Sequence, residues 1–373
     1  MKIAVNTWIL RNKKPDGIGF FTIHAISKLI EKHPNDEFII YCDKGFTESY
    51  FDYPNVKKYK IFPALRHPIL YFIYLEFVLP LVFLKHKPDI LLAPDGLISL
   101  NTSIKQISVI HDIYFEHQPQ DLPFRNRLYY RFFFKKFAKK ANRILTVSEY
   151  SKKDIMDTYN IGNEKIDVIY NNQSSNFVPL SSDEIQDVRN KYSSGEPYFL
   201  YIGSVHPRKN ITRLLQAFEL FKNQNCIKVK LLLAGNIYWK SHEVKSIFEA
   251  SNYKNDIIFL GRVSDAEMKL ILPSALCLMF ISLFEGFGVP IIEAFHSNVP
   301  VITSNTSSMP EIAGDAALLV NPLEIAQIKK AMLEICSNDN LRSELIERGS
   351  IQKQKFNWDI TSDFIWNNID EFK

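Results

Sequence analysis

The sequence predicts an α/β protein with two domains, each built on a parallel sheet. At 373 residues the chain exceeds the length at which a single hydrophobic core stops growing, so two domains are expected. Short apolar runs alternate with helix-like stretches, which is the pattern of a doubly wound parallel sheet. Residues 171–176 are polar enough to form a linker. We therefore expect a first domain over 1–172, a linker over 173–196 and a second domain over 197–355.

Composition and charge are those of an ordinary globular protein. Hydrophobic residues make up 46% of the chain and charged residues 23%, so disorder is not indicated. The net charge of +4 is unevenly divided, since residues 1–180 hold 25 Lys and Arg against 18 Asp and Glu. The cysteines are far apart and form no CxxC pair, so neither a disulfide framework nor a zinc site is expected; they are Cys42, Cys226, Cys277 and Cys336.

The sequence suggests neither a signal peptide nor a membrane span. The apolar start of the chain is interrupted early by basic residues, which is wrong for a signal peptide. The longest apolar segment, 69–84, contains Glu76 and Pro80 and is shorter than the roughly 20 residues that span a bilayer. We interpret it as a core or interfacial helix and expect a cytoplasmic protein.

The first half of the chain carries strand and helix signals in alternation. Gly17 and Gly19 follow the first expected strand and begin a helix that runs to about residue 33. Because the third position of a Gly-x-Gly-x-x-Gly fingerprint is Thr22 here, a nicotinamide-binding fold is disfavoured. Another strand ends at His111 and Asp112, a pair that is more often structural than catalytic. The expected strands are 2–8, 38–42, 90–93, 104–110, 143–147 and 166–170.

A basic and aromatic stretch, 124–143, is the most unusual feature of the first half. It holds eight Lys and Arg with no acidic residue, and aromatic residues lie between them. Three interpretations are open: a helix whose aromatic side faces the core, a helix that lies on an anionic membrane surface, and a nucleic-acid-binding stripe. The first two are favoured, and we expect no nucleic-acid partner.

The second half continues the same alternation. A strand at 198–203 leads through Ser204 to Arg208 and Lys209, and then to a helix from about residue 212 to 222. Cationic side chains at such a turn suit a diphosphate, because arginine offers a planar fork and lysine a point charge. Exposed loop cations are the alternative interpretation. Further strands are expected at 231–235, 257–261 and 275–281, and helices at 322–336, 340–349 and 356–372.

A glycine turn follows the apolar strand 275–281. Gly286 and Gly288 leave the backbone bare just before a helix, so a phosphate or a sugar hydroxyl can approach outward-pointing amides. Glu285 lies in the turn and Glu293 on the helix, so both can face the crevice where doubly wound sheets bind ligands. Taken alone, the two glutamates would more often be a loop charge and a solvated helix residue.

This turn resembles the signature of the family 4 retaining glycosyltransferases, in which two glutamates enclose seven residues. Glu285 and Glu293 reproduce that spacing, and the segments 300–304 and 307–317 also look like the family. The resemblance implies the GT-B fold, in which two Rossmann-like domains face each other across a cleft. It also implies that a final helix, about 356–373, packs back on the first domain, which binds the acceptor, while the second domain binds a nucleotide-diphosphate sugar.

The resemblance also implies roles for individual residues. Glu285 and His111 contact the donor sugar, and Glu293 contacts the ribose. Lys209 contacts the diphosphate, and Arg208 substitutes for an arginine that several members carry where this chain has Ser204. The further donor-binding residues are Gly286, Phe287, Gly288, Val289, Ser204, Gly235, Val263, Gly17 and Gly19.

We expect these residues to catalyse a retaining transfer that needs no metal and no cofactor. The sequence has cations at the expected leaving group and no clustered Asp-x-Asp motif. With no evident covalent nucleophile, the departing phosphate itself would take the proton of the acceptor. Glu293→Ala should weaken nucleotide binding, whereas Glu285→Ala should mainly remove transfer.

The Glu-Gly-Phe-Gly-Val-Pro version of the motif looks like members that assemble bacterial surface polysaccharides, among them mannosyl-, rhamnosyl- and glucosyltransferases. GDP-mannose is the expected donor, with a UDP-sugar as the alternative, and the acceptor is a glycan or a lipid-linked glycan. A peripheral position on the inner membrane face would explain both 69–84 and 124–143. A non-catalytic module that binds a nucleotide or a glycan is the alternative of another class.

Overall fold

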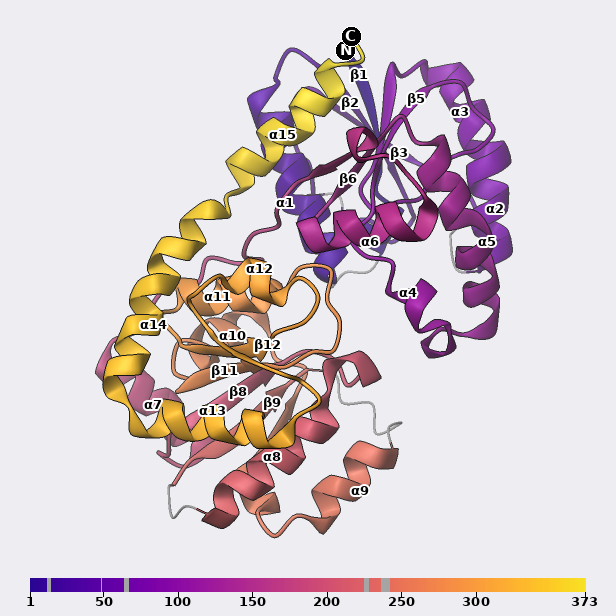
Figure 1. The fold of residues 1–373 in the computed structure, drawn as a ribbon. Helices are drawn as coiled ribbons and strands as arrows, with labels where there is room; N and C mark the ends of the chain where they lie inside the picture. The colour runs from indigo at the N-terminus through magenta and orange to yellow at the C-terminus, as the bar shows by residue number, and fades with distance from the viewer. Residues whose placement is uncertain (12–14, 48, 64–66, 225–227, 236–241) are drawn as a thin grey trace. The chain divides into compact units, whose positions relative to one another are not determined.

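The computed structural model describes residues 1–373 except 12–14, 48, 64–66, 225–227 and 236–241, so Cys226 lies outside it. The chain divides into two compact units: Met1–Ser174 with Phe356–Lys373, and Ser175–Lys355. Each unit has an all-parallel sheet with helices packed against it (Figure 1). The predicted α/β class with two doubly wound parallel sheets is confirmed.

The first unit contains a seven-stranded sheet in the order β3-β2-β1-β4-β5-β6-β7. The order reverses between β1 and β4, so the carboxyl ends of these two strands form a topological switch point, where such sheets bind ligands. The strands are β1 (Lys2–Asn6), β2 (Glu37–Cys42), β3 (Val56–Lys60), β4 (Ile90–Ala93), β5 (Lys105–Val109), β6 (Arg143–Thr146) and β7 (Ile166–Val168).

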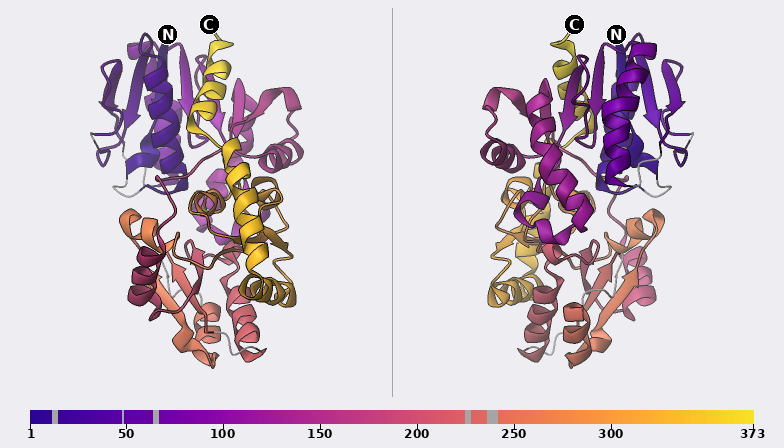
Figure 2. Two further views of the ribbon diagram at one scale, coloured as in Figure 1. Left: turned by 90° about the vertical axis from the view of Figure 1, so that its left-hand side faces the viewer. Right: turned by 90° about the vertical axis from the view of Figure 1, so that its right-hand side faces the viewer.

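Helices cover both faces of this sheet (Figures 1 and 2). Ile3 and Val5 of β1 pack in one cluster with α1 and α15, whereas Ala4 packs in another with α2, α3 and α5, as the alternation of a strand requires. The α-helices are α1 (Gly17–Lys32), α2 (Pro68–Ile73), α3 (Leu79–His86), α4 (Tyr114–His117), α5 (Phe124–Lys140), α6 (Glu149–Tyr159) and α15 (Trp358–Asp370). Shorter turns are η1 (Trp8–Arg11), the π-helical turn η2 (Tyr74–Val78), η3 (Pro119–Asp121) and η4 (Asn163–Lys165).

The segment Pro68–His86 is one continuous helix through α2, η2 and α3. Of the helices in the described part of the chain, it alone is long and apolar enough to cross a membrane by length and composition. It extends beyond both ends of the predicted segment 69–84. Tyr71, Tyr74 and Leu79 pack in the core, while the opposite side exposes large apolar side chains. This two-sided burial is that of a helix lying on the surface of the unit.

Helix α15 belongs to the first unit and packs on α1. The Trp358 indole N–H donates to the Gln173 carbonyl at 3.2 Å, and the Thr361 hydroxyl donates to the Tyr170 carbonyl at 2.6 Å. The rings of His33 and Trp366 stack with centroids 3.4 Å apart. Residues from the end of the chain therefore complete one face of a sheet formed near its beginning.

The second unit contains a six-stranded sheet in the order β10-β9-β8-β11-β12-β13. Its switch point lies between β8 and β11, where the strand order reverses. The strands are β8 (Tyr198–Ile202), β9 (Lys230–Ala234), β10 (Ile257–Gly261), β11 (Cys277–Phe280), β12 (Val301–Ser304) and β13 (Leu318–Val320). The helices are α7 (Ser182–Ser193), α8 (Ile211–Gln224), α9 (His242–Ala250), α10 (Asp265–Ile271), α11 (Val289–His296), α12 (Met309–Ala313), α13 (Ile325–Ser337) and α14 (Asp339–Gln352), with the turns η5 (Pro207–Lys209), η6 (Lys254–Asp256) and η7 (Lys353–Lys355).

The range 173–196, expected to be a linker, contains α7. Ser181 caps this helix by accepting from the Glu184 backbone N–H, and the Glu184 side chain accepts in return from the Ser181 backbone N–H. Such a capping box fixes the start of a helix. The boundary between the two compact units lies between Ser174 and Ser175, within the range expected to be the linker.

Candidate functional site

Three charged side chains meet at the switch point of the second unit. Lys209 follows β8 and Glu285 follows β11, and these strands are neighbours in the sheet. Lys209 Nζ lies 2.6 Å from Glu285 Oε1, and Arg208 Nη1 lies 3.8 Å from Glu285 Oε2. We call these three residues the clamp. The structure thus brings together three of the four residues predicted to be catalytic.

The clamp is sheltered from water. The side chains of Glu285 and Lys209 are only 9% and 13% exposed. Burial alone would raise the pKa of Glu285, but the charges of Lys209 and Arg208 and the hydrogen bond from Lys209 outweigh it, so the pKa lies below the ordinary value. Glu285 is therefore a carboxylate at neutral pH and holds both cations.

An aromatic ring and backbone hydrogen bonds fix the positions of the cations. Lys209 Nζ lies 5.0 Å from the centroid of the Phe280 ring, at the end of β11. The Leu283 N–H donates to the Arg208 carbonyl at 2.6 Å, which ties the two turns together. Beneath them, the buried Tyr201 hydroxyl donates to the Ser204 carbonyl at 3.0 Å.

Serine hydroxyls shape the turn that carries Glu285, a role that was not predicted from the sequence. The Glu285 N–H donates to Ser307 Oγ at 3.0 Å. The hydroxyl of Ser308 lies within hydrogen-bond distance of the carbonyls of both Glu285 and Phe287, at 2.9 and 2.7 Å. Both serines lie in the stretch 307–317 that resembles the family, and this resemblance is the sequence signal that points to them.

The glycine turn leads directly into α11. Gly288 is the N-cap with φ of +115°, a conformation that other residues rarely adopt, and the first turn of the helix contains Pro290. Gly286 and Phe287 are buried, and Val289 is the first residue of the helix. Glu293 is only 5% exposed, so it is a buried acid and not a solvated helix residue.

The other residues predicted to bind the donor in this unit follow neighbouring strands. Ser204, Gly235 and Val263 lie after β8, β9 and β10, so they share one edge of the sheet. A Cβ on Gly235 would lie 1.8 Å from the Gly203 carbonyl oxygen. Only a glycine allows the two turns to cross this closely.

The three predicted residues of the first unit lie at the start of α1 and the end of β5. Asp16 caps α1 by accepting from the Gly19 N–H at 3.0 Å, while a Cβ on Gly17 would meet nothing within 4 Å. The His111 ring meets the Phe21 ring of α1 edge-on, with centroids 4.9 Å apart. His111 and these glycines therefore lie near each other in the unit.

His111 is held as a neutral ring. Its Nε2 lies 2.9 Å from the Pro94 carbonyl oxygen, which can only accept, so Nε2 carries the proton. Burial lowers the pKa of His111, although the Pro94 carbonyl and the charges of Asp112 and Asp16 favour its charged form. A neutral His111 keeps a lone pair on Nδ1, which suits a sugar hydroxyl.

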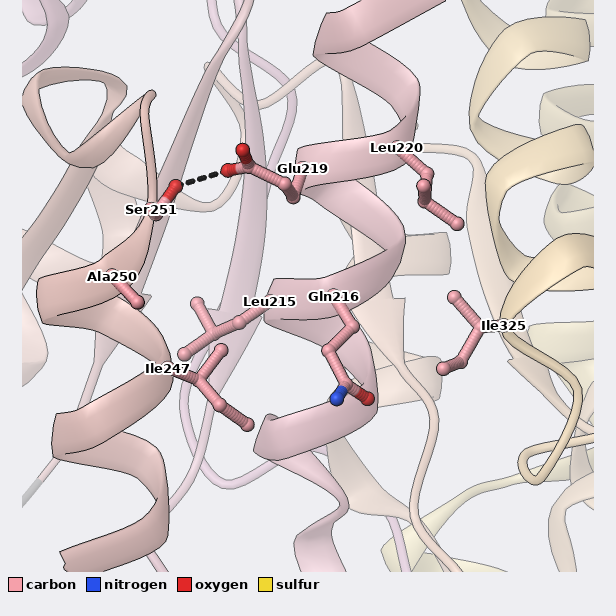
Figure 3. A pocket seen from close by; sticks show the side chains of 8 residues that line it. All are labelled: Leu215, Gln216, Glu219, Leu220, Ile247, Ala250, Ser251 and Ile325. Atoms are coloured by element: carbon pink, nitrogen blue, oxygen red, sulfur yellow. Dashed lines mark hydrogen bonds between the residues drawn. The ribbon is translucent and has the colours of Figure 1, made fainter.

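Two further observations concern metal binding and a separate cavity. Among the residues that the structure describes, no group of three or more His, Cys, Asp or Glu side chains is placed to hold a metal ion. A cavity of about 380 Å³ lies between α8 and α9, away from the clamp, and Figure 3 shows Glu219 accepting from the Ser251 hydroxyl at its edge. The lining of this cavity is mostly apolar and includes none of the predicted site residues. The lining residues are Leu215, Gln216, Glu219, Leu220, Ile247, Ala250, Ser251 and Ile325.

Solved structures share this fold over nearly the whole chain. Sucrose-phosphate synthase from Thermosynechococcus elongatus matches with a TM-score of 0.80 and 16% identity, covering 100% of this chain and 98% of that one. HepE from Anabaena, in complex with UDP and glucose, matches with a TM-score of 0.77 and 16% identity over 99% of both chains. These neighbours are GT-B glycosyltransferases, so the GT-B fold class is confirmed.

Curated relatives match over part of their length. The O-antigen chain mannosyltransferase B of Escherichia coli is 34% identical over 220 residues, which is 59% of this chain and 58% of that protein, so the match spans less than two thirds of it. The O-antigen chain mannosyltransferase RfbU of Salmonella typhimurium is 30% identical over 268 residues, which is 72% of this chain and 70% of that protein.

Family models cover both units. The model described as glycosyltransferase family 4 matches residues 17–171, and the model described as glycosyl transferases group 1 matches residues 182–352, which include the whole clamp. The chain therefore belongs to the family 4 glycosyltransferases.

Proposed function

We propose that this chain transfers mannose from GDP-mannose to a glycan or a lipid-linked glycan in surface-polysaccharide synthesis, with retention of anomeric configuration and without a metal. The observation that carries the proposal is the clamp, which places two cations and a carboxylate at the switch point of the second unit. Mannose as the sugar is supported by the names of the relatives from Escherichia coli and Salmonella typhimurium.

The clamp suits the chemistry of the leaving group. In the transfer, the bond between the anomeric carbon and the diphosphate oxygen breaks, and a bond from the acceptor oxygen to that carbon forms. Lys209 and Arg208 neutralise the charge that develops on the diphosphate, and the departing phosphate takes the proton of the acceptor hydroxyl. Contacts other than the pair with Glu285 also hold these residues, since Lys209 lies against the Phe280 ring and the Arg208 carbonyl accepts from the Leu283 N–H.

Donor binding also changes the partner of Glu285. In the structure, Glu285 neutralises Lys209 and Arg208. A diphosphate brings two or more negative charges to the same cations and relieves Glu285 of that role. Glu285 then accepts from hydroxyls of the donor sugar, while Glu293 holds the ribose and His111 accepts through Nδ1.

The donor is tested by incubating the purified protein with GDP-mannose, UDP-glucose or UDP-galactose, a panel of octyl glycosides, and either magnesium or EDTA. We expect GDP-mannose to be consumed in EDTA, and the new linkage to be α by NMR. Consumption of a UDP-sugar in place of GDP-mannose would overturn the proposed donor. A β linkage in the product would overturn retention of configuration. Activity that depends on magnesium would overturn the proposed metal independence.

Thermal unfolding with GDP, UDP, dTDP and ADP separates an enzyme from a binding module. A ligand at 100 times its Kd stabilises by about 2.7 kcal/mol, which is a shift of several degrees. GDP binding together with transfer supports the proposal, whereas GDP binding without turnover of any donor favours a non-catalytic module. In the transfer assay, Glu285→Ala is expected to lose activity. Glu334→Ala, which removes an exposed ion pair with Lys330, is the control variant for it.

We also propose that the first unit lies on the inner membrane face. Helix α5 buries Tyr129, Phe134 and Phe137 in the core, yet it exposes Phe124, Leu128 and Phe132. The buried side of this helix faces the core, and its exposed apolar side supports the membrane interpretation of 124–143. The exposed apolar residues of Pro68–His86 add to this surface: Ile69, Phe72, Ile73, Phe77, Leu81 and Leu84.

The two helices form one surface with basic side chains along it. The Phe72 and Phe133 rings lie 5.7 Å apart, and Lys136 Nζ lies 3.4 Å from the Phe132 ring centroid. Apolar groups beside cations suit anionic lipid headgroups over acyl chains. The exposed cations of α5 are Arg125, Arg131, Lys135, Lys136, Lys139 and Lys140.

Sedimentation with vesicles tests this surface. We expect binding to vesicles that contain phosphatidylglycerol, weak binding to phosphatidylcholine alone, and loss of binding in a Leu84→Ser, Phe132→Ser double variant. Leu319→Ser, at an exposed leucine of the second unit, is the matched control. Equal binding by the double variant and the wild type would overturn this part of the proposal.

A further inference from the structure

The switch point of the first unit holds polar atoms that have no hydrogen-bond partner. Asn6 ends β1, Trp8 follows it, and Asp95 lies just beyond β4, the neighbouring strand. Within the described chain, Asn6 Nδ2, Trp8 Nε1 and Asp95 Oδ2 are buried and unpaired. Buried polar groups are nearly always paired, so such a group in a native structure needs an explanation.

Each of these side chains is held in place by its other contacts. The Tyr74 hydroxyl, from the π-helical turn η2, donates to Asn6 Oδ1 at 3.1 Å, so the orientation of the fully buried amide is fixed. The π-helical geometry turns three successive residues inward, Tyr74 to Glu76. Turns of this kind occur often at functional sites.

Trp8 and Asp95 are fixed in the same way. The Trp8 ring is 6% exposed, with the Tyr71 ring 5.4 Å and the Arg11 guanidinium 4.9 Å from its centroid. Asp95 Oδ1 accepts from the Leu97 N–H at 3.1 Å. Burial raises the pKa of Asp95 to about 7, although the Leu97 amide and the Trp8 indole favour its charged form. The indole thus lies near the carboxylate without completing a hydrogen bond of normal geometry.

We propose that Asn6, Trp8 and Asp95 form a binding site for hydroxyl groups of the acceptor sugar. Two N–H donors and one carboxylate oxygen match a pair of neighbouring hydroxyls, because each hydroxyl both donates and accepts. The three groups are oriented before the ligand arrives, which lowers the cost of binding. The site rests on the proposed transfer reaction, and it assigns the acceptor to the switch point of the first unit.

The site adjoins a residue already expected to contact the donor sugar. The carbonyl that holds His111 belongs to Pro94, the residue before Asp95. A sugar bound at Asp95 therefore lies on the same short segment that orients His111. Through this segment, occupancy of the acceptor site bears on the position of the His111 ring.

The test compares Asp95→Asn and Trp8→Phe with wild type, using octyl α-mannoside as the acceptor probe and GDP-mannose hydrolysis by water as the baseline. In Trp8→Phe, the phenyl ring occupies the position of the indole ring between Tyr71 and Arg11, but it has no N–H group. We expect the KM for the probe to rise about tenfold in Asp95→Asn and at least threefold in Trp8→Phe. The Kd for GDP, which we assign to the second unit, should change by no more than about twofold.

Glu76→Gln is the matched control, since Glu76 is another buried carboxyl of this unit, and its two oxygens accept from the Leu100 N–H. An unchanged KM in both site variants, or an equal rise in the control, would overturn the site. Wild-type protein that hydrolyses GDP-mannose but does not use the probe would also overturn it. Protein that neither hydrolyses GDP-mannose nor binds GDP would instead contradict the proposed function.

Discussion

Replacing Glu285 by glutamine should destabilise the second unit strongly, although the two side chains have the same shape. The change removes the negative charge that holds Lys209 and Arg208. Breaking a buried ion pair by removing one partner costs about 3 to 5 kcal/mol. Because Lys209 keeps its contact with the Phe280 ring, we expect the lower end, about 3 kcal/mol.

The expected change depends on pH with a definite sign. Folding lowers the pKa of Glu285, so its contribution to the free energy of unfolding is present above the ordinary value of 4.5 and is lost as the pH falls through the lowered value. The difference between wild type and Glu285→Gln should therefore be full at pH 7 and shrink at acidic pH.

Differential scanning calorimetry measures the effect. For a unit of this size, about 3 kcal/mol corresponds to a fall in Tm of about 6 to 12 °C. Glu334→Gln, at an exposed pair in the same unit, should cost about 0.5 kcal/mol or less. A Tm within about 2 °C of wild type at pH 7, or a difference that grows toward acidic pH, would refute the assignment of Glu285 as the partner of both cations.

Three further predictions concern single residues. Gly235→Ala should lower the free energy of unfolding, measured in urea, by more than about 3 kcal/mol, because the new Cβ clashes with the Gly203 carbonyl. Gly261→Ala, where φ is +67° and the space is open, should lower it by about 1 to 2 kcal/mol. Similar losses in the two variants would contradict the close crossing of the turns at Gly235. Ser308→Ala removes a hydroxyl partner from two carbonyls of the glycine turn, so the free energy of unfolding should fall by about 1 to 2 kcal/mol, and kcat for transfer should fall as well. If both values stay unchanged, Ser308 does not hold the glycine turn in place. Because folding lowers the pKa of His111, the unfolded chain takes up the proton first, so stability should fall between pH 7 and pH 5 more steeply in wild type than in His111→Asn, as urea unfolding would show.

The sequence predicted most of the elements that form the switch points. The expected strands 2–8 and 90–93 correspond to β1 and β4, and the expected helix after Gly288 is α11. These segments are buried on both faces or follow a glycine, so their composition is distinctive. Strand β3, Val56–Lys60, was not predicted, because it is an edge strand whose three lysines read as a solvated loop.

Contacts between distant residues were harder to foresee. The ion pair of Lys209 with Glu285 joins two turns 76 residues apart, and only the strand order makes them neighbours. The π-helical turn η2 leaves no recognisable pattern in the sequence, so the link from Tyr74 to Asn6 was not foreseen. By contrast, the capping box at Ser181 and Glu184 is a readable signal that the linker interpretation overlooked.

The position of α15 bears on the order in which the chain acquires its structure during synthesis. Ile365 and Ile369 fill the same core cluster as β1 and α1, but the ribosome adds them only after the whole second unit has been made. Domains generally fold as units, amino-terminal first, as they emerge. Here the second unit has its complete sequence before the first, so the nascent chain carries an unfinished apolar face on α1 until α15 has emerged.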